Sequence, residues 1–363
     1  MAIVGRFEIE SRQYLDSHGR VIGPVPESAR DPEVLVALYR QMVLARSFDQ
    51  KMLALQRTGQ LGTFASGVGK EAVDIGMASA MRPEDSVFVT YRETTLQLAR
   101  GVTMLELLLY WGGDERGSNF AVPRGDFPVC ITIAAHCCHA VGVAYAYKLR
   151  KEPRVAVCAI GDGATSKGEF YEALNGAGIW RLPVIFLVTN NQWAISVPRK
   201  AQTAAATLAQ KAIAAGVPGI QVDGNDLIAM REVSLQAMER ARSGGGPTLI
   251  EALSYRLADH TTADDASRYR NAEEVAEAWQ REPIGRLRNY LVELGAWNKA
   301  QEEAWLKACA EQVQAAAQAY LEHPPPSARQ MFDCLHATLP AAWAMQRNHA
   351  LGRKTDDASG HAR

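Results

Sequence analysis

The stretch at residues 155–170 reads VAVCAIGDGATSKGEF, an apolar run followed by a glycine-rich turn and the start of a helical pattern. A glycine-rich turn between a strand and a helix is the usual architecture of a phosphate-binding loop. Asp162, however, stands in this turn between Gly161 and Gly163, where its carboxylate would repel a phosphate. The turn therefore raises the question of which anion could be held beside an aspartate.

Strand-like and helix-like segments alternate on both sides of this turn. Strands are predicted at 154–160, 183–189, 219–224 and 247–255, and helices at 167–180, 206–216 and 227–244. The run at 183–189, PVIFLVT, is almost continuously apolar, as buried parallel strands are. This βαβ alternation predicts an α/β fold with a doubly wound, mostly parallel sheet flanked by helices.

The rest of the chain is predicted to be an arm, further helices and a tail. Residues 1–34 read as an N-terminal arm that is irregular over its first ~30 residues, 35–325 as the α/β domain, and 326–363 as a C-terminal tail whose last dozen residues are disordered. Apolar spacing predicts helices at 32–56, 102–111 and 139–150, and a charged helical region at 271–320.

Composition sets the broad class of the protein. The chain has 363 residues, 47% of them hydrophobic and 22% charged, with a net charge of −1. These values are typical of a soluble globular protein and do not favour sequence-independent binding to nucleic acid. We find neither a membrane-spanning apolar run nor a signal or transit pattern, so the expected location is the cytoplasm. Reduced, mostly buried thiols are expected at the six cysteines, Cys130, Cys137, Cys138, Cys158, Cys309 and Cys334.

Two familiar phosphate-loop templates do not fit the GDG turn. A dinucleotide fingerprint needs its third glycine at position 166, whereas Gly168 comes two positions late. A Walker loop fits Gly163 and Gly168, but Glu169 and Phe170 replace its lysine and hydroxyl residue. The turn is therefore neither of these two loops.

A divalent metal between the carboxylate and the phosphate removes the repulsion. Asp162 supplies a hard oxygen of the kind that Mg²⁺ prefers, and Mg²⁺ usually keeps water and substrate phosphate among its ligands. Asn190 and Asn191 follow the strand at 183–189, and turns after neighbouring parallel strands lie side by side. The residues thus predict a metal-bridged diphosphate, with the alternative that Asp162 only caps the following helix.

Longer blocks carry a resemblance to a known family. Residues 161–191, from GDG to NN, resemble the thiamine-diphosphate motif. The blocks at 202–230, 246–256 and 258–270 resemble the α subunit of 2-oxoacid dehydrogenase E1 components, most of all the bacterial two-chain pyruvate enzymes. The resemblance runs from about residue 35 to about residue 320, with its blocks in the same order.

The resemblance implies that this chain supplies the Mg²⁺ and diphosphate half of a thiamine diphosphate site. Asp162, the side chain of Asn191 and the backbone carbonyl of Trp193 would bind the metal. Gly163 and Ala164 would present N–H groups to the diphosphate.

Three further segments are implied in the same site. Tyr91 and Arg92, in VTYRETT, would bind the diphosphate, since a guanidinium can pair with two phosphate oxygens. His260, in LADHTTADD, would be the catalytic histidine of the active-site loop. The backbone at Ile131 and Ile133 would touch the pyrimidine ring of the cofactor.

The run His136-Cys137-Cys138-His139 contains four potential metal ligands. Adjacent residues on a helix project about 100° apart, so they do not share one tetrahedral site without distortion. A metal site is therefore disfavoured here. The family usually has a glutamine at the position of His136, which leaves the local packing and any monovalent-cation site open.

The resemblance also implies a reaction and partners. The cofactor would decarboxylate a 2-oxoacid, and the acyl unit would pass to a lipoyl group on the E2 core. The glutamate that activates the cofactor belongs to the β subunit in two-chain members, so we expect an α₂β₂ heterotetramer, silent without β. Phe64 is assigned to the substrate pocket; Thr63 before it is no bulky aromatic, which favours pyruvate over branched-chain substrates. Acetoin-type enzymes, a non-catalytic scaffold and an NAD-dependent oxidoreductase are the alternatives.

Overall fold

The computed structural model describes residues 1–333 and 335–352. The chain divides into two compact units, Met1–Tyr320 and Leu321–Arg363. In the second unit, α12 (Gln330–Asp333) and α13 (Ala341–Gly352) are the described elements. Cys334 and the segment 353–363, where disorder was expected, lie outside the described residues. No helix within the described ranges is both long and apolar enough to cross a membrane.

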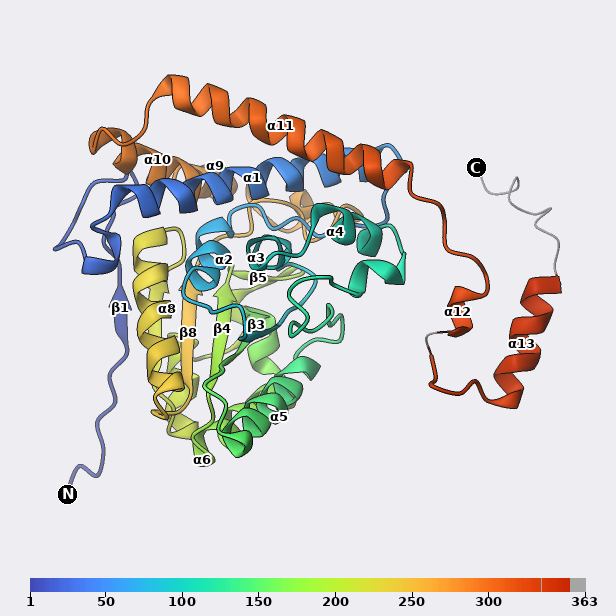
Figure 1. The fold of residues 1–363 in the computed structure, drawn as a ribbon. Helices are drawn as coiled ribbons and strands as arrows, with labels where there is room; N and C mark the ends of the chain where they lie inside the picture. Colours follow the sequence, from blue (N-terminus) through green and yellow to red (C-terminus); the bar gives the residue numbers. More distant parts are fainter. Residues whose placement is uncertain (334, 353–363) are drawn as a thin grey trace. The chain divides into compact units, whose positions relative to one another are not determined.

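The first unit is built on a six-stranded sheet in which every neighbouring pair is parallel, in the order β1-β7-β8-β4-β3-β2 (Figure 1). The strands are β1 (Glu10–Arg12), β2 (Ser86–Phe88), β3 (Ala156–Gly161), β4 (Val184–Asn190), β7 (Gly219–Asp223) and β8 (Thr248–Leu253). The predicted α/β fold with a parallel sheet is confirmed.

Helices cover both faces of this sheet because its strands are apolar on both sides. Side chains alternate between the faces of a strand. Cys158 and Phe186 belong to one apolar cluster, which includes α5 (Ala135–Arg150) and α6 (Gly168–Ile179). Their neighbours Val157 and Ile185 belong to the cluster on the opposite face, with α2 (Glu71–Ala78) and α8 (Leu227–Arg242). Burial of these side chains removes apolar surface from water, which stabilises the fold by about 25 cal/mol per Å².

A long N-terminal helix packs beside the sheet layers. α1 (Pro32–Arg57) begins where Asp31 accepts a hydrogen bond from the Glu33 N–H and Pro32 occupies the first helical position. The remaining helices of this unit are α3 (Thr94–Arg100), α4 (Met104–Trp111), α7 (Arg199–Gln202), α9 (Ala272–Trp279), α10 (Pro283–Glu293) and α11 (Lys299–Leu321). Tyr39 of α1 packs its ring edge-on against Trp297, 5.3 Å between centroids.

Several local features differ from the sequence prediction, which also contained neither α2 nor α3. The arm is not irregular throughout, because Glu10–Arg12 forms an edge strand beside β7. The strand β2 was not predicted, since three residues are too short for a periodic signal. The helix expected at 206–216 is a 3₁₀ helix, Ala209–Ala215. The antiparallel pair β5 (Trp193–Ala194) and β6 (Val197–Pro198) lies apart from the main sheet.

Candidate cofactor site

Four neighbouring strands end at the same edge of the sheet, and a loop follows each of them. Because β2, β3, β4 and β8 are adjacent and parallel, their carboxyl ends lie side by side. The loop after β3 carries Asp162, the one after β4 carries Asn191 and Trp193, the one after β2 carries Arg92, and the one after β8 carries His260. Sequence positions from 90 to 260 are thereby brought to one place.

These loops enclose a cavity of about 300 Å³. Its lining includes nine of the predicted site residues, Tyr91, Arg92, Ile133, Asp162, Gly163, Ala164, Asn191, Trp193 and His260. It also includes residues that the sequence argument did not single out, Lys70, Thr90, Glu93, Gly161, Lys167, Thr189, Ala194 and Ile195. The structure thus gathers most of the expected site into one concave surface.

The Asp162 carboxylate is buried at this site, with the residue 2% exposed. Oδ2 accepts a hydrogen bond from Nε2 of Gln202 at 2.8 Å. Burial raises the pKa of Asp162, although the Gln202 bond acts in the opposite direction. Within residues 1–333 and 335–352 this carboxylate forms no salt bridge, although the charge of Arg256 lowers its pKa from a longer distance. Burying an unpaired carboxylate is costly, so the charge calls for a cation that the side chains do not provide.

The two asparagines after β4 have different roles. Asn190 turns to the sheet, where Nδ2 donates to the buried Glu251 carboxylate at 2.7 Å. Asn191 lines the cavity, and its Oδ1 accepts the backbone N–H of Trp193 at 3.2 Å. The turn that continues from it holds Gln192 at φ 73° and Ile195 at φ 55°, which is unusual for residues with a side chain. Such strain is typical of functional loops.

Gly163 stands where no larger residue fits. A Cβ added there would lie 2.7 Å from the Cβ of Ala194. The close approach packs the GDG turn against the β5 segment. A larger side chain at position 163 would therefore displace the turn that carries Asp162.

Arg92 and His260 are held together at the cavity wall. Nη2 of Arg92 donates to the backbone oxygen of His260 at 2.7 Å and lies 3.2 Å from its Nδ1. The Tyr91 ring stands edge-on to the imidazole, 5.8 Å between centroids. Arg92 is buried, which lowers its pKa, but a guanidinium stays protonated under ordinary conditions.

A second arginine, which the sequence argument missed, orders the same loops. Nη2 of Arg256 donates to the backbone oxygen of Ile195 at 2.8 Å and to the Tyr269 hydroxyl at 2.7 Å. Its Nη1 lies 3.5 Å from Nδ1 of His260. Arg256 stands four residues before that histidine, so its position in SYRLADH was the available signal.

The electrostatics of the site keep His260 neutral. Burial lowers its pKa to about 4, and the cations Arg92 and Arg256 act in the same direction. Since both guanidinium groups are donors, Nδ1 must be the acceptor, which assigns the proton of the neutral ring to Nε2. His260 can therefore donate a hydrogen bond through Nε2.

Two expected residues are not brought to the cavity. Phe64 is fully buried, and its ring packs edge-on against Trp111 in the apolar cluster beside α1. Its backbone pairs instead with Thr262 in the His260 loop, at 3.0 Å from N to Oγ1 and 2.9 Å from O to the Thr262 N–H. Ile131 is 58% exposed and does not line the cavity, whereas Ile133 does.

The residues of the HCCH run also separate. His136 and Cys137 are buried, while Cys138 and His139 are exposed. Nε2 of His136 lies 2.9 Å from the backbone oxygen of Ala159. Among the described residues no group of three or more His, Cys, Asp or Glu side chains is placed to hold a metal. The run contributes to packing beside β3.

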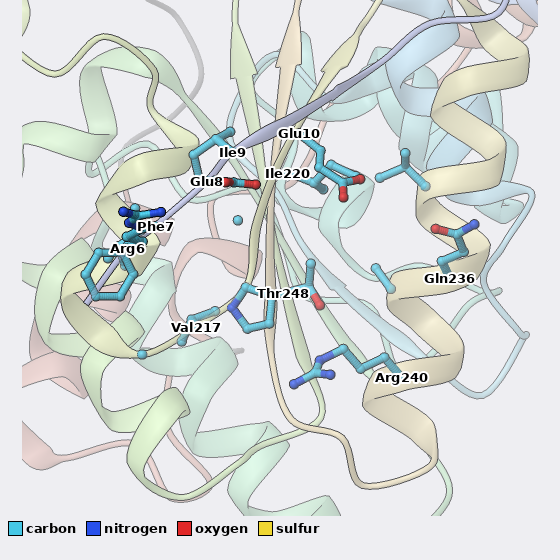
Figure 2. A pocket seen from close by; sticks show the side chains of 16 residues that line it. Arg6, Phe7, Glu8, Ile9, Glu10, Val217, Ile220, Gln236, Arg240 and Thr248 are labelled. Atoms are coloured by element: carbon cyan, nitrogen blue, oxygen red, sulfur yellow. The ribbon is translucent and has the colours of Figure 1, made fainter. Parts of the chain in front are cut away.

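A larger cavity, of about 630 Å³, lies elsewhere on this unit (Figure 2). It is formed where the N-terminal arm, Arg6–Glu10, passes over the beginnings of β7 and β8 at Gly219 and Thr248. In parallel sheets ligands bind at the carboxyl ends of the strands, not at their beginnings. The smaller cavity, with its converging charged groups, is therefore the candidate site.

Comparison with known proteins gives the family. Residues 39–329 match the dehydrogenase E1 component family. The chain belongs to this dehydrogenase E1 family. The E1 family is thiamine-diphosphate-dependent, and four strand ends that converge on a buried aspartate and a buried arginine are consistent with a site for a diphosphate.

Individual relatives of the E1 family are similar over most of their length. The pyruvate dehydrogenase E1 component subunit alpha of Mycoplasma genitalium is 42% identical over 92% of this chain and 94% of its own. That of Acholeplasma laidlawii is 44% identical over 79% of this chain and 84% of its own. The 3-methyl-2-oxobutanoate dehydrogenase subunit alpha of Mycobacterium tuberculosis is 44% identical over 75% of this chain and 74% of its own.

Proposed function

We propose that this chain is the α subunit of a pyruvate dehydrogenase E1 component and holds the Mg²⁺ and diphosphate half of a thiamine diphosphate site. The observation that carries the proposal is the convergence of Asp162, Asn191, Trp193, Arg92 and His260 on one cavity at the carboxyl ends of four parallel strands. The similarity to pyruvate enzymes over nearly the whole chain supports the substrate.

The donor set at this cavity fits Mg²⁺. A carboxylate, an amide oxygen and a backbone carbonyl, from Asp162, Asn191 and Trp193, are hard oxygen ligands. The buried Asp162 carboxylate forms no salt bridge within the described residues, so a divalent ion would offset its charge. The remaining coordination positions would be left for diphosphate oxygens and water.

The diphosphate would be bound by cations and backbone groups of this chain. Arg92 and Tyr91 would hold its oxygens, and the N–H groups of Gly163 and Ala164 would face it from the GDG turn. The absence of a side chain at Gly163 lets this turn pack against Ala194. Bound at this half-site, the cofactor supplies the carbanion chemistry that decarboxylates a 2-oxoacid.

His260 is the proposed catalytic residue of this chain. In the neutral form assigned above, its Nε2–H can donate to a negatively charged oxygen at the cavity. Arg92 and Arg256 hold the ring in this tautomer because both donate toward Nδ1. The imidazole would thus stabilise negative charge without first taking up a proton from water.

We further propose that the site is completed by a β subunit in an α₂β₂ assembly, which delivers the acyl unit to a lipoylated E2 core. Ile133 and Ile195, at the rim of the cavity, are 37% and 57% exposed. Large apolar side chains at the mouth of a cofactor site suit coverage by another chain.

The alternative substrate is 3-methyl-2-oxobutanoate, for which a relative of comparable identity is named. The test is decarboxylation by this chain reconstituted with its β partner, Mg²⁺ and thiamine diphosphate, with kcat/KM compared for the two 2-oxoacids. A preference for pyruvate of ten-fold or more, about 1.4 kcal/mol, supports the proposal. The reverse preference would reassign the chain to the branched-chain enzymes with the same site residues.

A further inference from the structure

Gln202, the last residue of α7, contacts the proposed metal ligand Asp162, from which it is 40 residues away in the sequence. Its Nε2 donates to Oδ2 of Asp162 at 2.8 Å and to the backbone oxygen of Val197 at 3.2 Å. Both partners are acceptors, so a flipped amide would set its oxygen against two other oxygens. The contacts therefore fix the orientation of the Gln202 carboxamide, with its donor side toward Asp162.

The other end of this carboxamide is a buried acceptor. Oε1 of Gln202 is buried and has no hydrogen-bond partner among the described residues. It lies 3.9 Å from the point that a Cβ on Gly163 would occupy, so it faces the GDG turn. A buried acceptor without a donor costs about 1–3 kcal/mol. This oxygen therefore marks a position for a donor that the chain itself does not supply.

We propose that Gln202 is a positioning residue of the metal site and selects Mg²⁺; this rests on the proposed function of that site. Its Nε2 donates to Oδ2 of Asp162, which would disfavour binding of the metal through both carboxylate oxygens. Its unpaired Oε1 would accept a hydrogen bond from a water molecule on the bound metal. The proposal adds a residue beyond the three ligands Asp162, Asn191 and Trp193.

This arrangement discriminates between cations by their coordination chemistry. Mg²⁺ is small, keeps several waters and is bound through single carboxylate oxygens, whereas Ca²⁺ readily takes both oxygens of one carboxylate. A carboxamide that donates to Oδ2 and accepts from a metal-bound water would favour the first ion over the second. Residues that orient metal ligands typically change metal affinity about 10–100-fold when they are replaced.

The test uses the enzyme assembled with its β partner and replaces Gln202 by Met, which has a similar length but neither donates nor accepts strongly. The dissociation constants of Mg²⁺ and of Ca²⁺ are measured by titration calorimetry at a fixed, saturating concentration of thiamine diphosphate. We expect the Mg²⁺ affinity to fall ten-fold or more and the Ca²⁺ affinity to fall less, so that the Mg²⁺/Ca²⁺ ratio decreases. The melting temperature of the metal-free enzyme should stay within a few degrees.

Two further variants serve as controls for this experiment. Lys200→Met makes the same new residue on the same short helix at an exposed position, and it should leave both affinities unchanged. Gln202→Asn keeps a carboxamide but shortens its reach by one methylene, and it should lower the Mg²⁺ affinity in the same direction as Gln202→Met. If Gln202→Met does not fold, Gln202→Asn can be measured in its place.

Three results would overturn the proposal: an unchanged Mg²⁺ affinity in both Gln202 variants, an equal loss for Mg²⁺ and Ca²⁺, or an equal loss in Lys200→Met. None of these three results would contradict the proposed metal and diphosphate site of the wild-type enzyme. A wild-type enzyme that takes up no thiamine diphosphate in the presence of Mg²⁺ would instead remove the proposed function and, with it, the role of Gln202.

Discussion

The guanidinium of Arg92 bridges two parts of His260, with Nη2 2.7 Å from the backbone oxygen and 3.2 Å from Nδ1. The two residues follow β2 and β8, on opposite sides of the β3–β4 pair, and are 168 positions apart in the sequence. One side chain thus fixes both the path of the histidine loop and the tautomer of its ring. The diphosphate site and the catalytic group are therefore expected to respond together to changes at Arg92.

The pKa of His260 is the first measurable consequence. It is lowered to about 4 by burial and by the facing cations, so the free protein should keep this ring neutral well below pH 6.5. Arg92→Gln removes one of those cations and should raise the pKa. Histidine resonances followed by NMR as a function of pH report it directly, and Arg240→Gln, at the other cavity, should leave it unchanged. A pKa near 6.5 in the wild-type protein would contradict this account.

The same shift predicts how stability depends on pH. The folded state holds His260 with a lowered pKa, so between about pH 6.5 and pH 4 the unfolded state binds more protons. The contribution of the neutral ring is present above pH 6.5 and is lost as the pH falls through this window. Urea unfolding at several pH values should show a flatter profile for His260→Gln than for the wild type. An identical slope for the two proteins would contradict the prediction.

Asp162→Asn should separate metal binding from folding. The amide is isosteric but neutral, so Mg²⁺-dependent binding of thiamine diphosphate should fall by at least 100-fold, about 2.8 kcal/mol. The metal-free protein should be no less stable, because a buried carboxylate without a salt bridge is removed. Asp226→Asn is the control, since Asp226 is equally buried but caps α8 and accepts the Tyr14 and Leu15 N–H groups. It should lower stability and leave the metal affinity intact.

The close approach at Gly163 predicts a compensating pair of substitutions. Gly163→Ala sets a new methyl group 2.7 Å from the Cβ of Ala194 and should displace the GDG turn, weakening thiamine diphosphate binding ten-fold or more. Ala194→Gly removes the opposing methyl group, so the double variant should recover most of the affinity. Gly168→Ala, outside the cavity lining and with nothing within 4 Å of its new Cβ, is the matched control. Additive losses in the double variant would contradict the steric explanation.

The sequence predicted this fold well because the strands of the sheet are apolar on both faces and their signals are local. The runs at 154–160 and 183–189 correspond to β3 and β4, and α1 begins at the predicted Pro32. The edge strand β1 was missed because three exposed residues carry no pattern; only the pairing with β7 makes them a strand.

The site was predictable where a loop follows a strand within the motif, and less so where contacts are distant. Asp162 and Asn191 follow adjacent strands, so their convergence could be inferred from the topology. Gln202 and Arg256 act through contacts with backbone and side chains far along the chain, for which the spacing gives no signal. Phe64 stays a prediction for the substrate pocket; in the structure its ring is buried edge-on against Trp111, outside the cavity lining.

The most direct test of the central claim is a calorimetric titration of thiamine diphosphate into the enzyme assembled from this chain and its β partner, with Mg²⁺ and with EDTA in its place. We predict tight binding of thiamine diphosphate with Mg²⁺ and an affinity at least 100-fold lower without it. Asp162→Asn should lower the affinity measured with Mg²⁺ to the same level. Binding that is indifferent to Mg²⁺ and to Asp162 would contradict the assignment of the metal and diphosphate site to this chain.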